Sequence, residues 1–113
     1  MINSIPVPYT GLLLVYLQIP FSRSLKDRRH VVRSVIDRVN QRWNIASFDL
    51  GPDGSRSEVF LCFTLVDRTS EMVKTRLDSV LSFIYKMEDR NGFSVIQKWV
   101  EVDCYDELSF GEN

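Results

Sequence analysis

Several residues on which common active sites depend are scarce in this chain of 113 residues. It has one histidine, His30, and five glycines, none of which forms a Walker or GxGxxG phosphate loop. The two cysteines, Cys62 and Cys104, are far apart and form no CxxC pair, so we expect reduced thiols. No cluster of His, Cys or Asp has the spacing of metal ligands. The sequence therefore predicts a protein that is not an enzyme and binds no metal or other cofactor.

Long hydrophobic runs are also missing. The longest run near the N-terminus, GLLLVYLQIPF at residues 11–21, falls well short of the roughly 20 residues that span a bilayer. It has no basic segment before it and no small-residue cleavage site after it, so we do not interpret it as a signal peptide. With 44% hydrophobic and 26% charged residues, the composition is typical of one soluble globular domain. We expect a cytoplasmic protein with no membrane contact.

Hydrophobic periodicity predicts six elements of regular structure. Short, nearly continuous apolar runs indicate strands, and apolar residues at helical spacing behind a capping residue indicate helices. Ser24, with Asp27 three residues later, resembles a capping box and opens the first helix, whereas Asp67 or Thr69 caps the second. The predicted order is strand 12–19, helix 24–43, strands 44–50 and 58–66, a helix ending near Lys86, and strand 93–105.

This order predicts an α+β fold of the ferredoxin-like βαββαβ kind, a four-stranded antiparallel sheet with two helices on one face. The first and third strands are the most apolar, which agrees with central positions in such a sheet. The predicted domain spans residues 11–103. Residues 1–10, with two prolines, form an N-terminal extension, and residues 104–113 form an acidic C-terminal tail.

The sheet face without helices is expected to be apolar, because side chains alternate along each central strand and both alternating sets are apolar. A contiguous apolar face of several hundred Å² normally marks an interface. We therefore expect a homo-oligomer formed through this open face, and the alternative is that the terminal segments fold over it. The sets that can point outward are Leu12, Leu14 and Tyr16 or Leu13, Val15 and Leu17 on the first strand, and Phe60, Cys62 and Thr64 or Leu61, Phe63 and Leu65 on the third.

Two functional classes that share this topology are disfavoured. Acylphosphatases need a glycine-rich loop between the first strand and first helix, where this chain has PFSRS at residues 20–24. RNA-recognition motifs stack bases on aromatic residues of the first and third strands. The third strand, SEVFLCFTLV, lacks the basic-glycine-aromatic pattern of that class. We interpret Tyr16, Phe60 and Phe63, like Trp43 and Trp99, as core or interface residues.

The start of the first helix carries an unusual concentration of positive charge. Residues 21–43 hold seven Arg or Lys against two Asp, a net charge of +5, while the rest of the chain holds seven basic and thirteen acidic residues, a net charge of −6. A helix N-terminus is already positive and usually attracts acidic residues, and its first amides lack partners within the helix. A phosphate group of RNA would supply the missing negative charge. The candidate anion- and RNA-binding residues are Arg23, Lys26, Arg28, Arg29 and Arg33.

This charge is also compatible with a protein that binds no RNA. The side chains can simply be solvated, or they can be neutralised by Asp37, four residues after Arg33, or by the acidic C-terminal tail of the same or a neighbouring chain. Arg28 is a special case, because its angular position lies within the apolar arc of the helix. Its guanidinium must extend to solvent or find a partner.

SLKDRRHVVRSVIDRV follows a strand ending in LQIP, and WNIASFD and LDSVLSFI come later in the chain. In this combination and order, the segments resemble the YlxP-like family, a bacterial family of unknown function. The resemblance covers residues 11–103 and implies the ferredoxin-like fold. Genes of the family often lie near those for translation initiation factor two and ribosome-binding factor A, which implies a role close to RNA or the ribosome. The family supplies no catalytic residues.

These observations lead to one expectation and two alternatives. We expect a non-enzymatic, RNA- or ribosome-associated accessory protein that binds phosphate through the basic helix start. The first alternative is an assembly protein whose basic helix pairs with acidic segments of itself or of a partner. The second is a small-molecule regulatory module, which would need a pocket at a subunit boundary.

Overall fold

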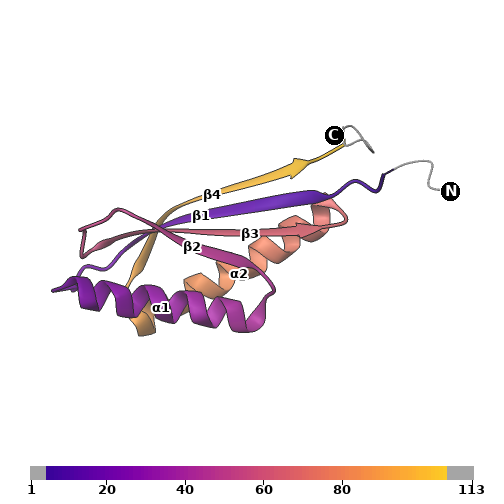
Figure 1. The fold of residues 1–113 in the computed structure, drawn as a ribbon. Helices are drawn as coiled ribbons and strands as arrows, with labels where there is room; N and C mark the ends of the chain where they lie inside the picture. The colour runs from indigo at the N-terminus through magenta and orange to yellow at the C-terminus, as the bar shows by residue number, and fades with distance from the viewer. Residues whose placement is uncertain (1–4, 107–113) are drawn as a thin grey trace.

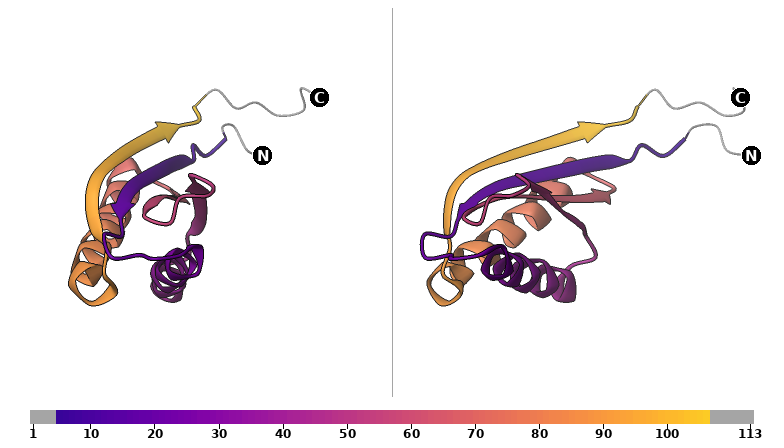
Figure 2. Two further views of the ribbon diagram at one scale, coloured as in Figure 1. Left: turned by 90° about the vertical axis from the view of Figure 1, so that its left-hand side faces the viewer. Right: turned by 60° about the vertical axis from the view of Figure 1, so that its left-hand side comes forward.

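The computed structural model describes residues 5–106, which form one four-stranded sheet and two helices in the order βαββαβ (Figure 1). The elements are β1 (Tyr9–Gln18), α1 (Leu25–Arg42), β2 (Ala46–Gly51), β3 (Glu58–Asp67), α2 (Ser70–Asn91) and β4 (Ser94–Cys104). All strand pairs are antiparallel, and the strand order is β2-β3-β1-β4. Both helices cover the same face of the curved sheet (Figure 2). The predicted ferredoxin-like α+β fold and the central positions of β1 and β3 are confirmed.

Two element ends differ from the predicted ones by three residues or more. β1 begins at Tyr9, inside the segment expected to be an extension, because this end of the strand pairs with both β3 and β4. α2 continues beyond Lys86 because Met87 extends its buried face. It ends where Gly92 adopts a φ of 68°, a left-handed conformation that glycine takes without steric cost.

The helix caps follow the sequence signals. Ser24 caps α1, and its hydroxyl accepts a hydrogen bond from the Asp27 amide at 3.1 Å. Of the two candidates for the second cap, Thr69 is the one used, since its hydroxyl accepts from the Met72 amide at 3.1 Å. Asp67 instead ends β3 and pairs with Arg76 of α2, with 3.2 Å between Oδ2 and Nη1. Each cap satisfies an amide that the helix itself leaves without a partner.

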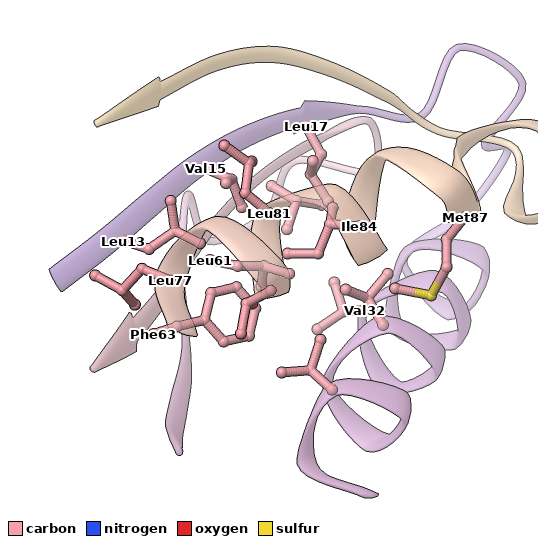
Figure 3. Packing of buried hydrophobic residues seen from close by; sticks show 14 of the residues in the cluster. Leu13, Val15, Leu17, Val32, Leu61, Phe63, Leu77, Leu81, Ile84 and Met87 are labelled. Atoms are coloured by element: carbon pink, nitrogen blue, oxygen red, sulfur yellow. The ribbon is translucent and has the colours of Figure 1, made fainter. Parts of the chain in front are cut away.

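The core lies between the helices and the sheet (Figure 3). It settles which alternating set of each central strand points inward: Leu13, Val15, Leu17, Leu61, Phe63 and Leu65 are buried. Burying a leucine or phenylalanine side chain contributes roughly 1.5 to 3 kcal/mol, so this core is the main source of stability. The alternate set, which includes Leu12, Leu14, Tyr16, Phe60 and Cys62, lies on the open face.

One glycine makes the close approach of α2 to β1 possible. A Cβ atom added at Gly11 would collide with Cγ1 of Val73 and would lie 2.7 Å from Cδ1 of Leu77. Both contacts are far shorter than the ordinary separation of two carbon atoms in van der Waals contact. The absence of a side chain at this point of β1 therefore lets the buried side of α2 rest on the strand.

Candidate anion-binding site

Three of the predicted basic residues lie together on the exposed side of α1. Lys26, Arg29 and Arg33 are spaced three and four residues apart, so they share one side of the helix. With His30 they line a shallow hollow of about 290 Å³. Arg23 lies just before the helix and is also exposed. The structure thus brings Lys26, Arg29 and Arg33 together on the first half of α1, whereas Arg23 lies outside the hollow that they line.

Arg28 has the opposite orientation. Only 7% of it is exposed, and its guanidinium reaches from α1 to the sheet. Nη1 and Nη2 donate to the two carboxylate oxygens of Asp49 at 2.8 and 3.0 Å, and Nε donates to the backbone carbonyl of Glu58 at 2.9 Å. These bonds engage all three guanidinium nitrogens. Arg28 has therefore found an internal partner, and its prediction as an anion-binding residue was wrong.

Asp49 is the residue of this site that sequence reasoning missed. It stands opposite Leu61 in the β2–β3 register, so it points to the helix-covered face. The hydrogen bonds from Arg28 hold its pKa below the usual value near 3.8, and partial burial opposes this shift. The Gly51 amide donates a further bond at 2.9 Å, which also lowers the pKa. An acidic residue at an inward position of β2 was the available signal, although it does not identify Arg28 as the partner.

The Arg28–Asp49 pair has a positioning role. It joins the first turn of α1 to β2, and the bond from Arg28 to Glu58 joins the same turn to the start of β3. A bidentate guanidinium–carboxylate contact fixes both distance and orientation. Arg28 therefore holds the helix start against the sheet, while Lys26 and Arg29 remain exposed.

The amides of the helix start are less available than the sequence suggested. The Asp27 amide donates to Ser24 Oγ, and the Arg28 amide donates to the Ser24 carbonyl at 3.2 Å. The Asp27 carboxylate in turn accepts from the Arg23 amide at 2.9 Å, which completes a variant of the capping box. The amides of Asp27 and Arg28 are therefore not free to bind an anion. Asp27 also supplies the acidic group that stabilises the first turn.

Neutralisation by Asp37, one of the alternatives, is not supported by an ion pair to Arg33 in the described part of the chain. Within residues 5–106, the ion pairs shorter than 4.0 Å are Arg28–Asp49 and Arg76–Asp67. Neither involves a cation of the hollow. Neutralisation by the C-terminal tail concerns mostly residues 107–113, which lie outside the described residues.

A second, larger hollow of about 560 Å³ lies between the end of α1 and the middle of α2. The Arg42 guanidinium stands over the Phe83 ring at 4.7 Å, and Trp43 packs edge-on against the same ring with 5.3 Å between centroids. Trp43 thus takes part in the packing between the helices. Asp78 lines this hollow together with Arg42 and Lys86, so the hollow carries charges of both signs. It is therefore a weaker anion site than the hollow lined by Lys26, Arg29 and Arg33.

Other site types have little support in the part of the chain that the structure describes. No three His, Cys, Asp or Glu side chains of residues 5–106 lie close enough together to hold a metal ion. Cys62 and Cys104 are both free of disulfide bonds, and burial raises the pKa of the Cys62 thiol. Neither α1 nor α2 is long and apolar enough to cross a membrane.

Fold and site together define a class: a small ferredoxin-like α+β domain with a cluster of cations at the exposed start of its first helix. The chain belongs to the family described as "Protein of unknown function (DUF503)", which matches residues 10–96. This is the YlxP-like family that the sequence motifs resemble. The family description assigns no activity, so function must be argued from the residues.

Similar proteins add little to this argument. No curated protein matches the sequence. The de novo designed protein Foldit4 is similar over 89% of this chain and 99% of its own, at 13% identity and a TM-score of 0.48. A C-terminal segment of the alpha subunit of aIF2 from Pyrococcus abyssi is similar over 94% of this chain and 53% of its own, at 11% identity and a TM-score of 0.46. Likenesses this weak carry no argument about function.

Proposed function

We propose that the protein is a non-enzymatic accessory factor that binds phosphate groups of RNA, on the ribosome or on ribosomal RNA, through the exposed start of α1. The observation that carries the proposal is the hollow that Lys26, Arg29 and Arg33 line together. Among residues 5–106, no acidic side chain forms an ion pair with any of these three cations. Arg23 stands at the same end of the helix. Arg28 belongs to the scaffold, since Asp49 already engages it.

The geometry of α1 suits a phosphate backbone. Lys26 and Arg33 are about 10 Å apart along the helix axis, with Arg29 between them. Three cations in a row can contact successive phosphates of one strand and release the counterions that the strand holds. Arg29 and Arg33 offer planar forks that can donate two hydrogen bonds to one phosphate, whereas Lys26 acts as a point charge.

The test is co-sedimentation with ribosomal particles, and fluorescence anisotropy with a ribosomal RNA fragment, over a salt series. A Lys26→Ala, Arg29→Ala, Arg33→Ala variant is compared with an Arg68→Ala, Lys74→Ala, Arg90→Ala control that removes the same charge from exposed positions elsewhere. The site variant should lose most binding at low salt. A plot of log affinity against log salt concentration should be less steep for this variant than for wild type, with a slope less negative by about 2 to 3. Equal behaviour of both variants, or a wild type that binds no RNA, would refute the proposal.

The alternative, an assembly protein whose basic helix pairs with acidic segments, keeps one supporting observation. Glu101, Asp103 and Asp106 are exposed at the end of β4 and just after it. Removing the acidic tail, residues 104–113, which include Asp106, separates the two functions. If acidic segments neutralise the helix, the deletion should weaken the oligomer, whereas an RNA-binding protein should keep its oligomer and bind RNA equally or more tightly.

A further inference from the structure

The open sheet face carries an ordered aromatic cluster at its centre. The Tyr16 and Phe60 rings, on the two central strands, stack with 4.6 Å between centroids and 9° between planes. The Trp99 ring of β4 lies 6.5 Å from Phe60. Trp99 remains 46% exposed and Phe48 of β2 68% exposed, so each edge strand adds an exposed aromatic side chain to this face. Leucines at positions 12 and 14 complete it along β1.

This face is large enough for a stable interface. Strands of ten, six, ten and eleven residues, about 4.8 Å apart, cover a plane of roughly 600 Å². This area is of the same order as the ~800 Å² that each partner buries in an ordinary stable complex. Contiguous apolar patches of several hundred Å² on a soluble protein commonly mark interaction sites. The face therefore needs an occupant.

Its charge argues against nucleic acid as that occupant. Strand register places Glu58, Glu101 and Asp103 on this face, while none of the described strand positions that point to it holds Lys or Arg. Tyr16 donates a hydrogen bond to the Glu58 carboxylate at 3.3 Å, so an acidic group lies beside the aromatic centre. A strand of RNA stacked here would meet repulsion and no cation.

The edge of β4 is also a poor place for a partner. Lys98 stands opposite Val15, so its charge lies on the helix side of an edge strand. The β1–β4 register also shifts between Tyr16 and Leu17. Charged inward-facing residues and bulges both oppose the addition of a further strand at an edge. A partner is therefore expected to cover the face of the sheet and not to extend it beyond β4.

We infer that a second copy of this chain covers the open face, giving a symmetric face-to-face dimer. The Tyr16–Phe60 pair lies on the two central strands, so a twofold axis through the middle of the sheet brings this pair against its own copy. Glu101 and Asp103 lie on the edge strand β4, at the rim of such an interface. An apolar aromatic centre with a polar rim is the usual anatomy of a protein interface.

The dimer leaves both basic helix starts exposed. Because α1 and α2 cover the opposite face of each sheet (Figure 2), face-to-face packing places the helices of the two copies on the two outer surfaces. The Lys26, Arg29 and Arg33 groups of the two copies then lie on opposite sides of the assembly. If the proposed function holds, on which this consequence rests, one dimer can hold two RNA segments at once.

The test is sedimentation equilibrium of the full chain at about 100 µM and below. Wild type should have twice the 13.2 kDa mass of one chain. A Phe48→Lys, Trp99→Lys variant should be monomeric, because it places charge on the open face. A Met72→Lys, Tyr85→Lys control should stay dimeric, because it adds the same charge at exposed positions of α2. Circular dichroism shows whether each variant is folded. A monomeric wild type, or two variants with the same association constant, would overturn the inference.

Salt separates this inference from the proposed function. The rim residues of both copies are acidic, so raising the salt from about 0.1 M to about 1 M should tighten the dimer by screening their repulsion. The same change should weaken RNA binding. A wild-type dimer that tightens with salt and binds no RNA supports the dimer and refutes only the proposed function. A dimer that weakens with salt contradicts the interface described here, because it would then be held by opposite charges.

Discussion

Replacing Asp49 with asparagine tests whether the Arg28 contact holds the basic helix start in place. The substitution keeps the shape of the side chain but removes the negative charge that two guanidinium nitrogens share at 2.8 and 3.0 Å. Arg28 is then a buried cation without a counter-ion: it keeps its bond to the Glu58 carbonyl, and the asparagine oxygen can accept from one guanidinium nitrogen, but the amide nitrogen cannot accept from the other. Removing one partner of a fully buried pair costs about 3 to 5 kcal/mol. The Asp49 side chain is 32% exposed, so water can replace part of the lost contact, and we expect about 2 kcal/mol.

The loss is measured by urea denaturation at neutral pH, followed by circular dichroism. A loss of about 2 kcal/mol corresponds to a melting temperature lower by roughly 8 to 12 °C for a domain of this size. Asp37→Asn is the matched control, because Asp37 is an exposed acid of α1 without an ion pair among residues 5–106. It should change the free energy of unfolding by less than about 0.5 kcal/mol. If the two variants lose the same stability, the assigned role of the pair is wrong.

The pH dependence gives an independent check with a defined sign. Because the folded-state pKa of Asp49 is lowered from about 3.8, its stabilising contribution is fully present above that value. It is lost as the pH falls through the lower folded-state pKa, where the carboxylate takes up a proton. The stability difference between wild type and Asp49→Asn should therefore be constant from neutral pH to about pH 5 and shrink below about pH 4. A difference that stays unchanged down to acid-induced unfolding would contradict this assignment.

Two further changes test the scaffold of the site. Gly11→Ala should lower the free energy of unfolding by about 1 to 3 kcal/mol, because the new methyl group collides with Val73 and Leu77. A thermal melt that matches wild type would show that α2 can move away at no cost. Ser24→Ala should cost about 1 kcal/mol through the lost bond to the Asp27 amide. Ser24→Thr should retain most of that stability in urea denaturation, and equal losses in both variants would exclude capping as the cause.

Much of the fold follows from local pattern. The βαββαβ order follows from the alternation of strand-like apolar runs with segments of helical spacing. The caps at Ser24 and Thr69 follow from the residue types at the helix starts. These features depend on contacts between residues close in sequence, which is why they can be recognised without a structure. The end of α2 was harder to predict. The helix continues to Asn91 because Met87 packs into the core, and this contact depends on the tertiary structure.

The candidate site was predictable to a similar extent. Helical spacing places Lys26, Arg29 and Arg33 on one side of α1 and Arg28 within the apolar arc, and the structure shows this arrangement. The partner of Arg28 was not predictable. Asp49 is 21 residues away and reaches the guanidinium only through the position of β2 in the sheet. No local pattern encodes that distance.

The sequence by itself determined the class of fold, the helix starts, the charge asymmetry and the apolar character of both sides of the central strands. Only the tertiary structure decided which side of β1 and β3 faces the helices, since both alternating sets are apolar and local pattern does not distinguish them. Gly11 belongs to the inward set and is a position at which α2 approaches β1 closely. That packing leaves Tyr16, Phe60 and Trp99 together on the open face, because strand pairing aligns residues that are far apart in the chain.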